Sequence, residues 1–78
     1  MKTHIVAIFN QLEGDNKLHC VLAENEVAAV KKAIIENCKE EYRTDDFKAW
    51  VNGSGETLEE VEQSAHEGEL CISNVLTI

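Results

Sequence analysis

The hydrophobic pattern of this chain changes its period near residue 24, and this change constrains the fold more than any other feature. Before it, residues 3–10 and 17–23 are rich in β-branched and other apolar side chains, which is typical of strands. After it, apolar side chains recur at intervals of three and four residues, which predicts an amphipathic helix over residues 24–43. The stripe of this helix consists of Val27, Val30, Ile34 and Cys38. Because both periods occur in one chain, we expect an α+β fold in which the helix packs on a sheet.

The two strands are expected to form a hairpin, since turn-forming residues 13–16 separate them. With Gly14-Asp15 as a two-residue loop, Phe9 lies opposite Cys20 and Ala7 lies opposite Leu22. One face of the hairpin then carries Ile5, Ala7, Phe9, Leu18, Cys20 and Leu22, and the other carries His4, Val6, Ile8, His19 and Val21. We expect Val6, Ile8, Val21 and Trp50 to form a second apolar surface, left open for a partner or a dimer.

The second half of the chain is expected to add two strands and a short helix. Residues 47–51 alternate in polarity and predict a third strand. Thr57 and Glu60 fit a capping box, which begins a helix that ends near Gly68. Residues 69–78 predict the last strand, with a bulge or an edge at Asn74.

The expected order of elements is therefore ββαβαβ. It predicts a mainly antiparallel four-stranded sheet with two helices packed on one face. A chain of 78 residues has enough apolar surface for one core only, so residues 1–78 are expected to be a single domain.

The charges are distributed unevenly along the chain. Residues 1–39 contain five acidic and five basic side chains, whereas residues 40–78 contain ten acidic side chains against Arg43 and Lys48. The second half therefore carries the whole net charge of −8. A surplus of this size repels phosphate backbones and anionic lipid, which argues against direct nucleic-acid binding and membrane association. No apolar run approaches the roughly 18 residues of a membrane span, and the start lacks a signal-peptide pattern, so we expect a cytoplasmic protein.

The acidic half has two interpretations. It is either a solvated surface that keeps a small protein in solution or a docking surface for a basic partner. For the docking interpretation, the candidate partner-binding residues are Asp45, Asp46, Glu56, Glu59, Glu60, Glu62 and Trp50.

The cysteines and histidines do not form a recognisable site. Cys20, Cys38 and Cys71 lack metal-binding spacing, and each is expected to be a small apolar core residue. His4, His19 and His66 are too far apart in the predicted fold to share a metal, and we expect them at the surface or partly packed.

Other patterns that carry chemistry are incomplete as well. The sequence Gly53-Ser54-Gly55 precedes a helix but lacks the lysine of a P-loop, so we expect a flexible loop. Paired carboxylates such as Asp45-Asp46 need a pocket that shifts their pKa values before they can act as acid and base, and no pattern predicts one. We therefore expect no catalytic residue, no metal and no cofactor, and the protein is not expected to be an enzyme.

In general character, that of a small acidic α+β domain, the chain resembles the compact inhibitors that phages and mobile elements encode against host defence, such as anti-CRISPR and anti-restriction proteins. The resemblance rests on composition and on no particular residue. It implies an inhibitor or modulator that docks its acidic half on a basic, nucleic-acid-binding protein. The alternative is a structural homo-oligomer or accessory subunit that associates through an open sheet face or an edge strand.

Overall fold

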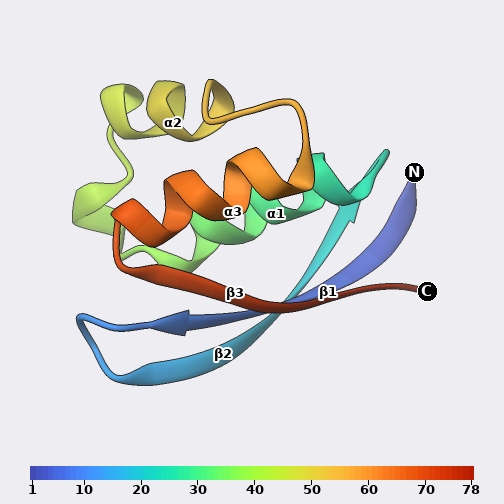
Figure 1. Cartoon of the computed structure of the whole chain (residues 1–78), viewed down its shortest axis with the longest axis horizontal. Helices are drawn as coiled ribbons and strands as arrows, with labels where there is room; N and C mark the ends of the chain where they lie inside the picture. Colours follow the sequence, from blue (N-terminus) through green and yellow to red (C-terminus); the bar gives the residue numbers. More distant parts are fainter.

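The computed structural model describes all 78 residues and contains three strands, three α-helices and one short 3₁₀ helix (Figure 1). In chain order these are β1 (Lys2–Asn10), β2 (Asp15–Ala23), α1 (Glu26–Asn37), η1 (Glu40–Tyr42), α2 (Asp45–Asn52), α3 (Leu58–Glu67) and β3 (Leu70–Thr77). The α+β class is confirmed. The predicted ββαβαβ order, with four strands and two helices, is wrong.

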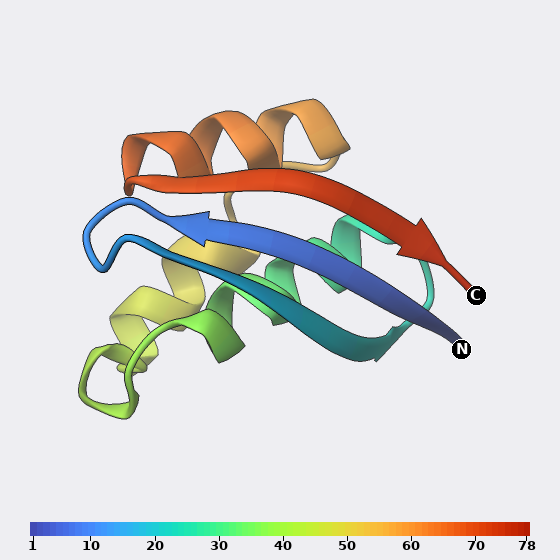
Figure 2. The same cartoon turned by 90° about the horizontal axis from the view of Figure 1, so that it is seen from below.

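The strands form one sheet in the order β2-β1-β3, and both pairs are antiparallel. The first and last strands are thus neighbours, and the amide of Ile78 donates to the carbonyl of Thr3 across 2.9 Å. Figure 2 shows β1 between the two edge strands, with both chain termini at the same end of the sheet. The helices lie on one side of the sheet, so its other side is open (Figures 1 and 2).

Residues 47–51, predicted as a strand, belong to α2. Thr44 caps this helix, because its side-chain oxygen accepts from the amide of Phe47 at 3.2 Å. Two aspartates occupy the first turn, where the helix dipole favours negative charge. The apolar alternation over five residues is equally compatible with a helix, since Phe47 and Val51 are four positions apart. The cap and the acidic first turn therefore outweigh the alternation, and the sheet has no fourth strand.

The hairpin between β1 and β2 has a longer loop than predicted. Asn10 pairs with Asp15, so residues 11–14 form the loop and Phe9 lies opposite Asn16 instead of Cys20. The side chain of Asn10 stabilises this loop, because its Oδ1 accepts from the amides of residues 12 and 13 at 3.1 and 3.2 Å. The pairing differs from the prediction by four positions. Because this is an even number, the residues that were predicted to share a face of the hairpin still do so.

The two faces of the hairpin are grouped correctly but assigned to the wrong sides. Val6 and Ile8, expected on an open surface, are fully buried beneath the helices. Trp50, expected on the same open surface, lies on α2. The face that contains Ile5 and Phe9 is the one that points away from the helices.

Polar side chains on the helix side of the sheet explain the difference. His4 is buried, with Nε2 3.2 Å from the carbonyl of Ala23 and Nδ1 3.0 Å from the hydroxyl of Thr77. Asn10 is also buried, and its amide donates to Oδ1 of Asn37 at 3.1 Å. Because these groups have partners, the face that carries them can be buried. The expectation of a surface or partly packed histidine is wrong for His4.

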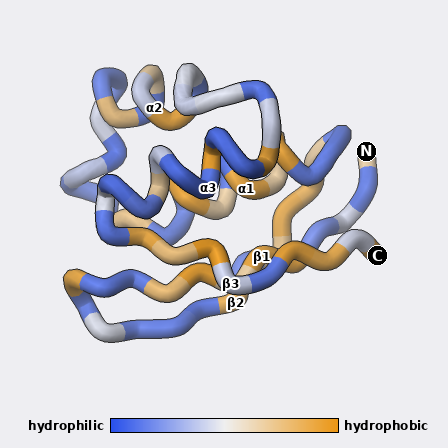
Figure 3. The backbone as a smooth tube through the Cα atoms, viewed as in Figure 1, coloured by the Kyte–Doolittle hydropathy of each residue, from blue (hydrophilic) through white to orange (hydrophobic).

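The core lies between the sheet and the helices α1 and α3. Helix α1 packs on β1 and β2, α3 covers β3, and α2 packs on α1 from outside. The buried cluster consists of Val6, Ile8, Ala23, Ala29, Val30, Ala33, Ile34, Val51, Val61, Ala65 and Leu70. The predicted core positions Val30 and Ile34 are confirmed. Figure 3 shows hydrophilic residues on the outer turns of the helices and hydrophobic stretches along β1 and β3. None of the helices is long and apolar enough to cross a membrane.

Helix α1 is shorter than predicted at both ends. Asn25 caps its start, because the side-chain oxygen accepts from the amide of Ala28 at 2.8 Å. At the other end, the Arg43 guanidinium donates to the carbonyls of Glu36 and Cys38 at 2.8 and 2.9 Å. The guanidinium thus takes the place of the backbone amides that would donate to these carbonyls if the helix continued. The chain therefore leaves the helix after residue 37 and folds back as η1.

The last third of the chain follows the prediction more closely. The capping box forms in part, because Thr57 Oγ1 accepts from the amide of Glu60 at 3.2 Å and donates to the Glu60 carboxylate at 3.0 Å. A bulge or an edge was predicted at Asn74, and the pairing of β3 with β1 shows a bulge next to it: Asn74 pairs with Ala7 and Ile72 with Ile8, so Ser73 is the extra residue. Beyond the bulge, Val75 pairs with Val6 on the helix side of the sheet, and Leu76 pairs with Ile5 on the open side.

Candidate binding site

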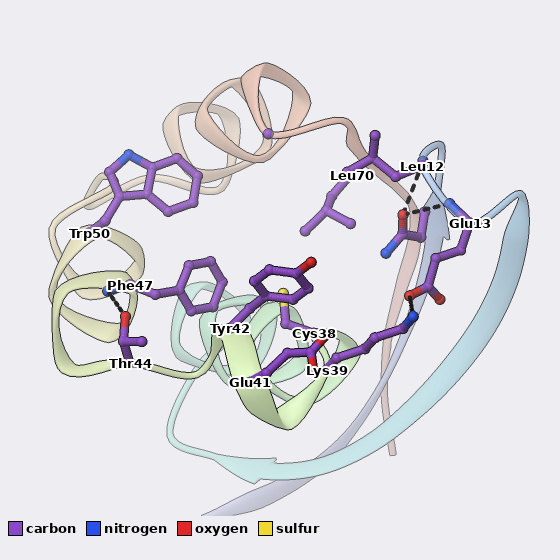
Figure 4. Close-up of a pocket in the computed structure, with 12 residues that line it drawn as sticks. Leu12, Glu13, Cys38, Lys39, Glu41, Tyr42, Thr44, Phe47, Trp50 and Leu70 are labelled. Atoms are coloured by element: carbon purple, nitrogen blue, oxygen red, sulfur yellow. Dashed lines mark hydrogen bonds and ion pairs between the residues drawn. The ribbon is translucent and has the colours of Figure 1, made fainter.

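Four segments that are distant in the sequence enclose a hollow of about 670 Å³ near the hairpin loop (Figure 4). The segments are residues 10–13, residues 38–44, one face of α2, and the connection from α3 to β3. Its apolar lining consists of Leu12, Cys38, Tyr42, Phe47, Trp50 and Leu70. Its remaining lining consists of Asn10, Glu13, Lys39, Glu41, Thr44 and Gly68. We call it the aromatic hollow.

Three of the four aromatic residues of the chain line this hollow. Trp50 is 42% exposed and Tyr42 is 62% exposed, whereas Phe47 is half-buried beneath them. The rings of Phe47 and Trp50 are 6.0 Å apart and inclined by 32°, which is a favourable aromatic contact. The Trp50 ring also lies against Gly68, where an added Cβ would be 3.4 Å from it. Large aromatic surface is therefore held in place and left accessible.

A hydrogen-bond network fixes the floor of the hollow. Asn10 binds the hairpin loop through its side-chain oxygen and Asn37 through its amide group. Asn37 in turn donates to Nε2 of His19 at 2.8 Å. The hairpin loop is also joined to the start of β3, because the amide of Gln11 donates to the carbonyl of Glu69 at 2.9 Å. The loop is thus connected to α1, β2 and β3.

One charged side chain that lines the hollow has no ion-pair partner. Lys39 is paired with Glu13 at 3.7 Å, so this pair is neutral as a whole. The Arg43 guanidinium is directed to the end of α1 and bound to its carbonyls. Glu41 also lines the hollow and takes part in no ion pair. The hollow therefore offers aromatic surface next to the free carboxylate of Glu41.

Two ionisable groups, Cys38 in the lining of the hollow and His19 next to Asn37, have shifted pKa values. Burial raises the pKa of the Cys38 thiol, the nearby Arg43 lowers it and Glu13 raises it further, with a net increase. The thiol is therefore neutral near pH 7 and is a poor nucleophile. Burial lowers the pKa of His19, in agreement with Nε2 accepting a hydrogen bond from Asn37. No group of three histidine, cysteine or acidic side chains is placed to hold a metal ion.

The predicted partner-binding residues fall into two groups. Trp50 lines the hollow, and Asp45 and Asp46 lie in the first turn of the same helix. Glu59 and Glu60 line a different depression, of about 500 Å³, which is formed by polar residues only. Glu56 precedes α3 in the loop, and Glu62 is half-buried on α3 outside this depression. The acidic candidates therefore do not form one continuous site with Trp50.

Sequence reasoning missed Tyr42, Phe47 and Leu12 as site residues. Phe47 was assigned to a strand, and the other two were assigned no role. The spacing of three residues between Phe47 and Trp50 is a helical signal that could have placed both rings on one side. Nothing in the sequence indicates that the hairpin loop approaches them, since that contact joins residues 10–13 to residues 38–50.

The cysteines differ from the prediction in two of three cases. Cys20 and Cys71 are exposed on the strands, and only Cys38 is partly buried. Both exposed thiols lie on the side of the sheet that no helix covers.

Comparisons with protein-family models, with curated proteins and with solved structures each find no match. The functional inference is therefore drawn from the geometry of the site.

Proposed function

We propose that this protein is a non-enzymatic binding module that docks on a basic partner protein through the aromatic hollow. In this proposal an arginine or lysine side chain of the partner enters between Tyr42, Phe47 and Trp50. The observation that carries it is the convergence of these three rings on an accessible hollow whose lining includes the free carboxylate of Glu41. A basic protein that binds nucleic acid is the kind of partner favoured by the net charge of −8. Binding would then inhibit or modulate that partner.

The aromatic residues of the hollow support the proposal that the partner is a protein. Tryptophan and tyrosine are enriched among the residues that contribute most to binding energy, and they act from pockets near the centre of an interface. Trp50 has this character, because its ring lies against Phe47 and Gly68 while 42% of its surface remains exposed, and Tyr42 adds a second ring that is 62% exposed. Burial of that exposed surface is the main apolar gain that a partner provides.

The rings and the Glu41 carboxylate support the proposal that a cationic side chain of the partner enters the hollow. A guanidinium or ammonium group is attracted to the face of an aromatic ring, and the attraction is strongest with tryptophan. Glu41 lies in the lining and can accept a hydrogen bond from such a group. Arginine suits the hollow better than lysine does, because its planar group both stacks on rings and binds carboxylates in a bidentate manner.

The experiment uses the fluorescence of Trp50, which is the only tryptophan in the chain. The protein is titrated with a capped Gly-Arg-Gly-Arg-Gly peptide and with the same peptide containing citrulline, which keeps the shape but removes the charge. We expect the arginine peptide to change the emission and to bind at least about tenfold more tightly than the citrulline peptide. Affinity for the arginine peptide should fall as salt increases, because exposed charges are screened over about 8 to 10 Å.

Two variants locate the binding surface. The first replaces Glu41 of the lining together with Asp45 of the first turn of α2, Glu41→Gln with Asp45→Asn, and should weaken binding of the arginine peptide. The second is the matched control Glu59→Gln with Glu60→Gln, which removes the same number of charges from α3 and should have a smaller effect. Equal affinity for the two peptides would refute the cationic ligand. A larger loss in the α3 variant would move the docking surface to the polar depression.

A further inference from the structure

The open face of the sheet carries no charged side chain, although charged residues make up 28% of the chain. It consists of Thr3, Ile5, Ala7 and Phe9 of β1, Asn16, Leu18, Cys20 and Leu22 of β2, and Cys71, Asn74, Leu76 and Ile78 from β3 and the residue after it. An antiparallel sheet with one face in water normally alternates apolar and polar residues, and its edges usually bear charges. Here nine of the twelve side chains of the open face are apolar, as are the buried residues of the opposite face, which is the pattern of a sheet that is covered on both sides.

The apolar part of this face is large enough for a specific interface. Phe9, Leu18, Leu22, Leu76 and Ile78 are 37%, 74%, 57%, 54% and 75% exposed, which together equals about three fully exposed large side chains. At roughly 150 Å² for each, these residues present about 450 Å². The other residues of the face add to this area. The smallest specific interfaces bury about 500 Å² on each partner and those of standard size about 800 Å², so the open face lies at the lower end of the range.

We propose that the open face is a homodimer interface, on which a second copy of the same chain packs its own open face. This inference goes beyond the proposed function, because the open face shares no residue with the aromatic hollow. Two sheets that pack face to face are about 10 Å apart and bury apolar side chains between them, as in a β-sandwich. A two-fold axis makes such an interface self-complementary, since each residue meets the same surface on the other copy.

The distribution of charge favours a second copy over other occupants. A basic partner is attracted to carboxylates, and the open face has none. An anionic lipid surface repels a chain with a net charge of −8. In a face-to-face dimer the helices of both copies point outward, so the two acidic layers lie on the order of 30 Å apart. That separation exceeds the Debye length of about 8 Å at physiological ionic strength, so the repulsion between the copies is largely screened.

The test is the mass of the protein in solution, measured by sedimentation equilibrium from 1 to 200 µM chain. The variant Leu18→Glu places a carboxylate in the interface, and the matched control is Leu12→Glu. Leu12 is 76% exposed, lies on the same hairpin and is outside the open face, so the two variants make the same chemical change at equal exposure. We expect a dimer for the wild type and for Leu12→Glu. For Leu18→Glu we expect the dissociation constant of the dimer to be at least about 100-fold higher, because each copy would bury an unpaired charge.

A second measurement needs no substitution. Cys20 and Cys71 lie on the open face, whereas Cys38 lies in the hollow. Labelling with a maleimide, located by mass spectrometry of peptides, should become slower at Cys20 and Cys71 as the protein concentration rises, with no change at Cys38. Circular dichroism shows whether Leu18→Glu retains the fold; if it does not, the labelling of the wild type decides. A monomeric wild type at 200 µM, a dimer that survives Leu18→Glu in a folded protein, or labelling independent of concentration would each overturn the proposal.

Discussion

Replacement of Ile34 by alanine should remove a large part of the stability of this domain. Ile34 is 2% exposed and lies in the buried cluster between the sheet and the helices. The substitution removes three carbon atoms, which corresponds to about 2.4 kcal/mol of transfer free energy at about 0.8 kcal/mol each. A cavity remains that its neighbours can fill only in part, so the total loss should be about 3 to 4 kcal/mol.

The neighbouring residue provides a matched control. Ile35 is on the same helix and undergoes the same chemical change, but it is half-buried at the surface next to β2. Its replacement by alanine exposes no closed cavity and should reduce the free energy of unfolding by about 1 kcal/mol. The effect of alanine on helix propensity is the same at both positions and cancels in the comparison.

Urea and thermal unfolding, followed by circular dichroism at one fixed protein concentration, measure the difference. A domain of this size has a free energy of unfolding of roughly 4 to 12 kcal/mol, so Ile34→Ala removes a substantial fraction of it. Its melting temperature should fall by about 15 to 25 °C, against about 5 °C for Ile35→Ala. The urea m-value should stay unchanged. Equal losses for the two variants would show that the face of α1 with Ile34 is not the one that packs on the sheet.

Three further predictions concern the backbone and a histidine. Gly55→Ala should lower the free energy of unfolding, measured in urea, by about 1 to 3 kcal/mol, because φ is 156° at this residue and an added Cβ would collide with the Cβ of Glu60. Unchanged stability would show that the loop can move away. Glu69→Gly should raise the free energy of unfolding by about 0.5 to 1 kcal/mol in the same assay, because Glu69 has φ 63°, a conformation that favours glycine. A decrease in stability would show that the Glu69 side chain makes a stabilising contact. Burial lowers the pKa of His19 below its ordinary value of 6.5, so the unfolded chain takes up the proton first, and the melting temperature should fall as the pH decreases from about 7 to 5. His19→Gln should reduce that slope, and an unchanged slope would assign the pH dependence to other groups.

Local signals predicted the start of α3, the core positions of α1 and an irregularity of the last strand near Asn74 well. Thr57 and Glu60 predicted the start of α3, and Val30 and Ile34 predicted the buried side of α1, because caps and helical periodicity act within a few residues. The misassigned segment, residues 47–51, is the shortest one. Over five residues the strand and helix periods predict nearly the same apolar positions, so periodicity alone gives no decision.

The candidate site was predictable only in part. Trp50 was named as a candidate residue, and its neighbour Phe47 has a helical spacing that a longer window would reveal. Leu12 was not predictable, because its approach to Trp50 depends on how the hairpin loop bends toward α2. Two sets of hydrogen bonds hold this bend: Asn10 Oδ1 accepts from two amides of its own loop, and the Asn10 amide donates to Asn37, a residue 27 positions away.

The sequence by itself determined the α+β class, the uneven charge, and which side chains of the hairpin share a face. These properties depend on composition and on the two-residue period of a strand, and neither changes when the loop lengthens by an even number of positions. Only the tertiary structure decided which face is covered. Both faces of β1 carry apolar side chains, and the covered face is the one on which long-range contacts satisfy the polar groups of His4 and Asn10. As a consequence, the uncharged face that contains Ile5, Phe9 and Leu18 is the one left open.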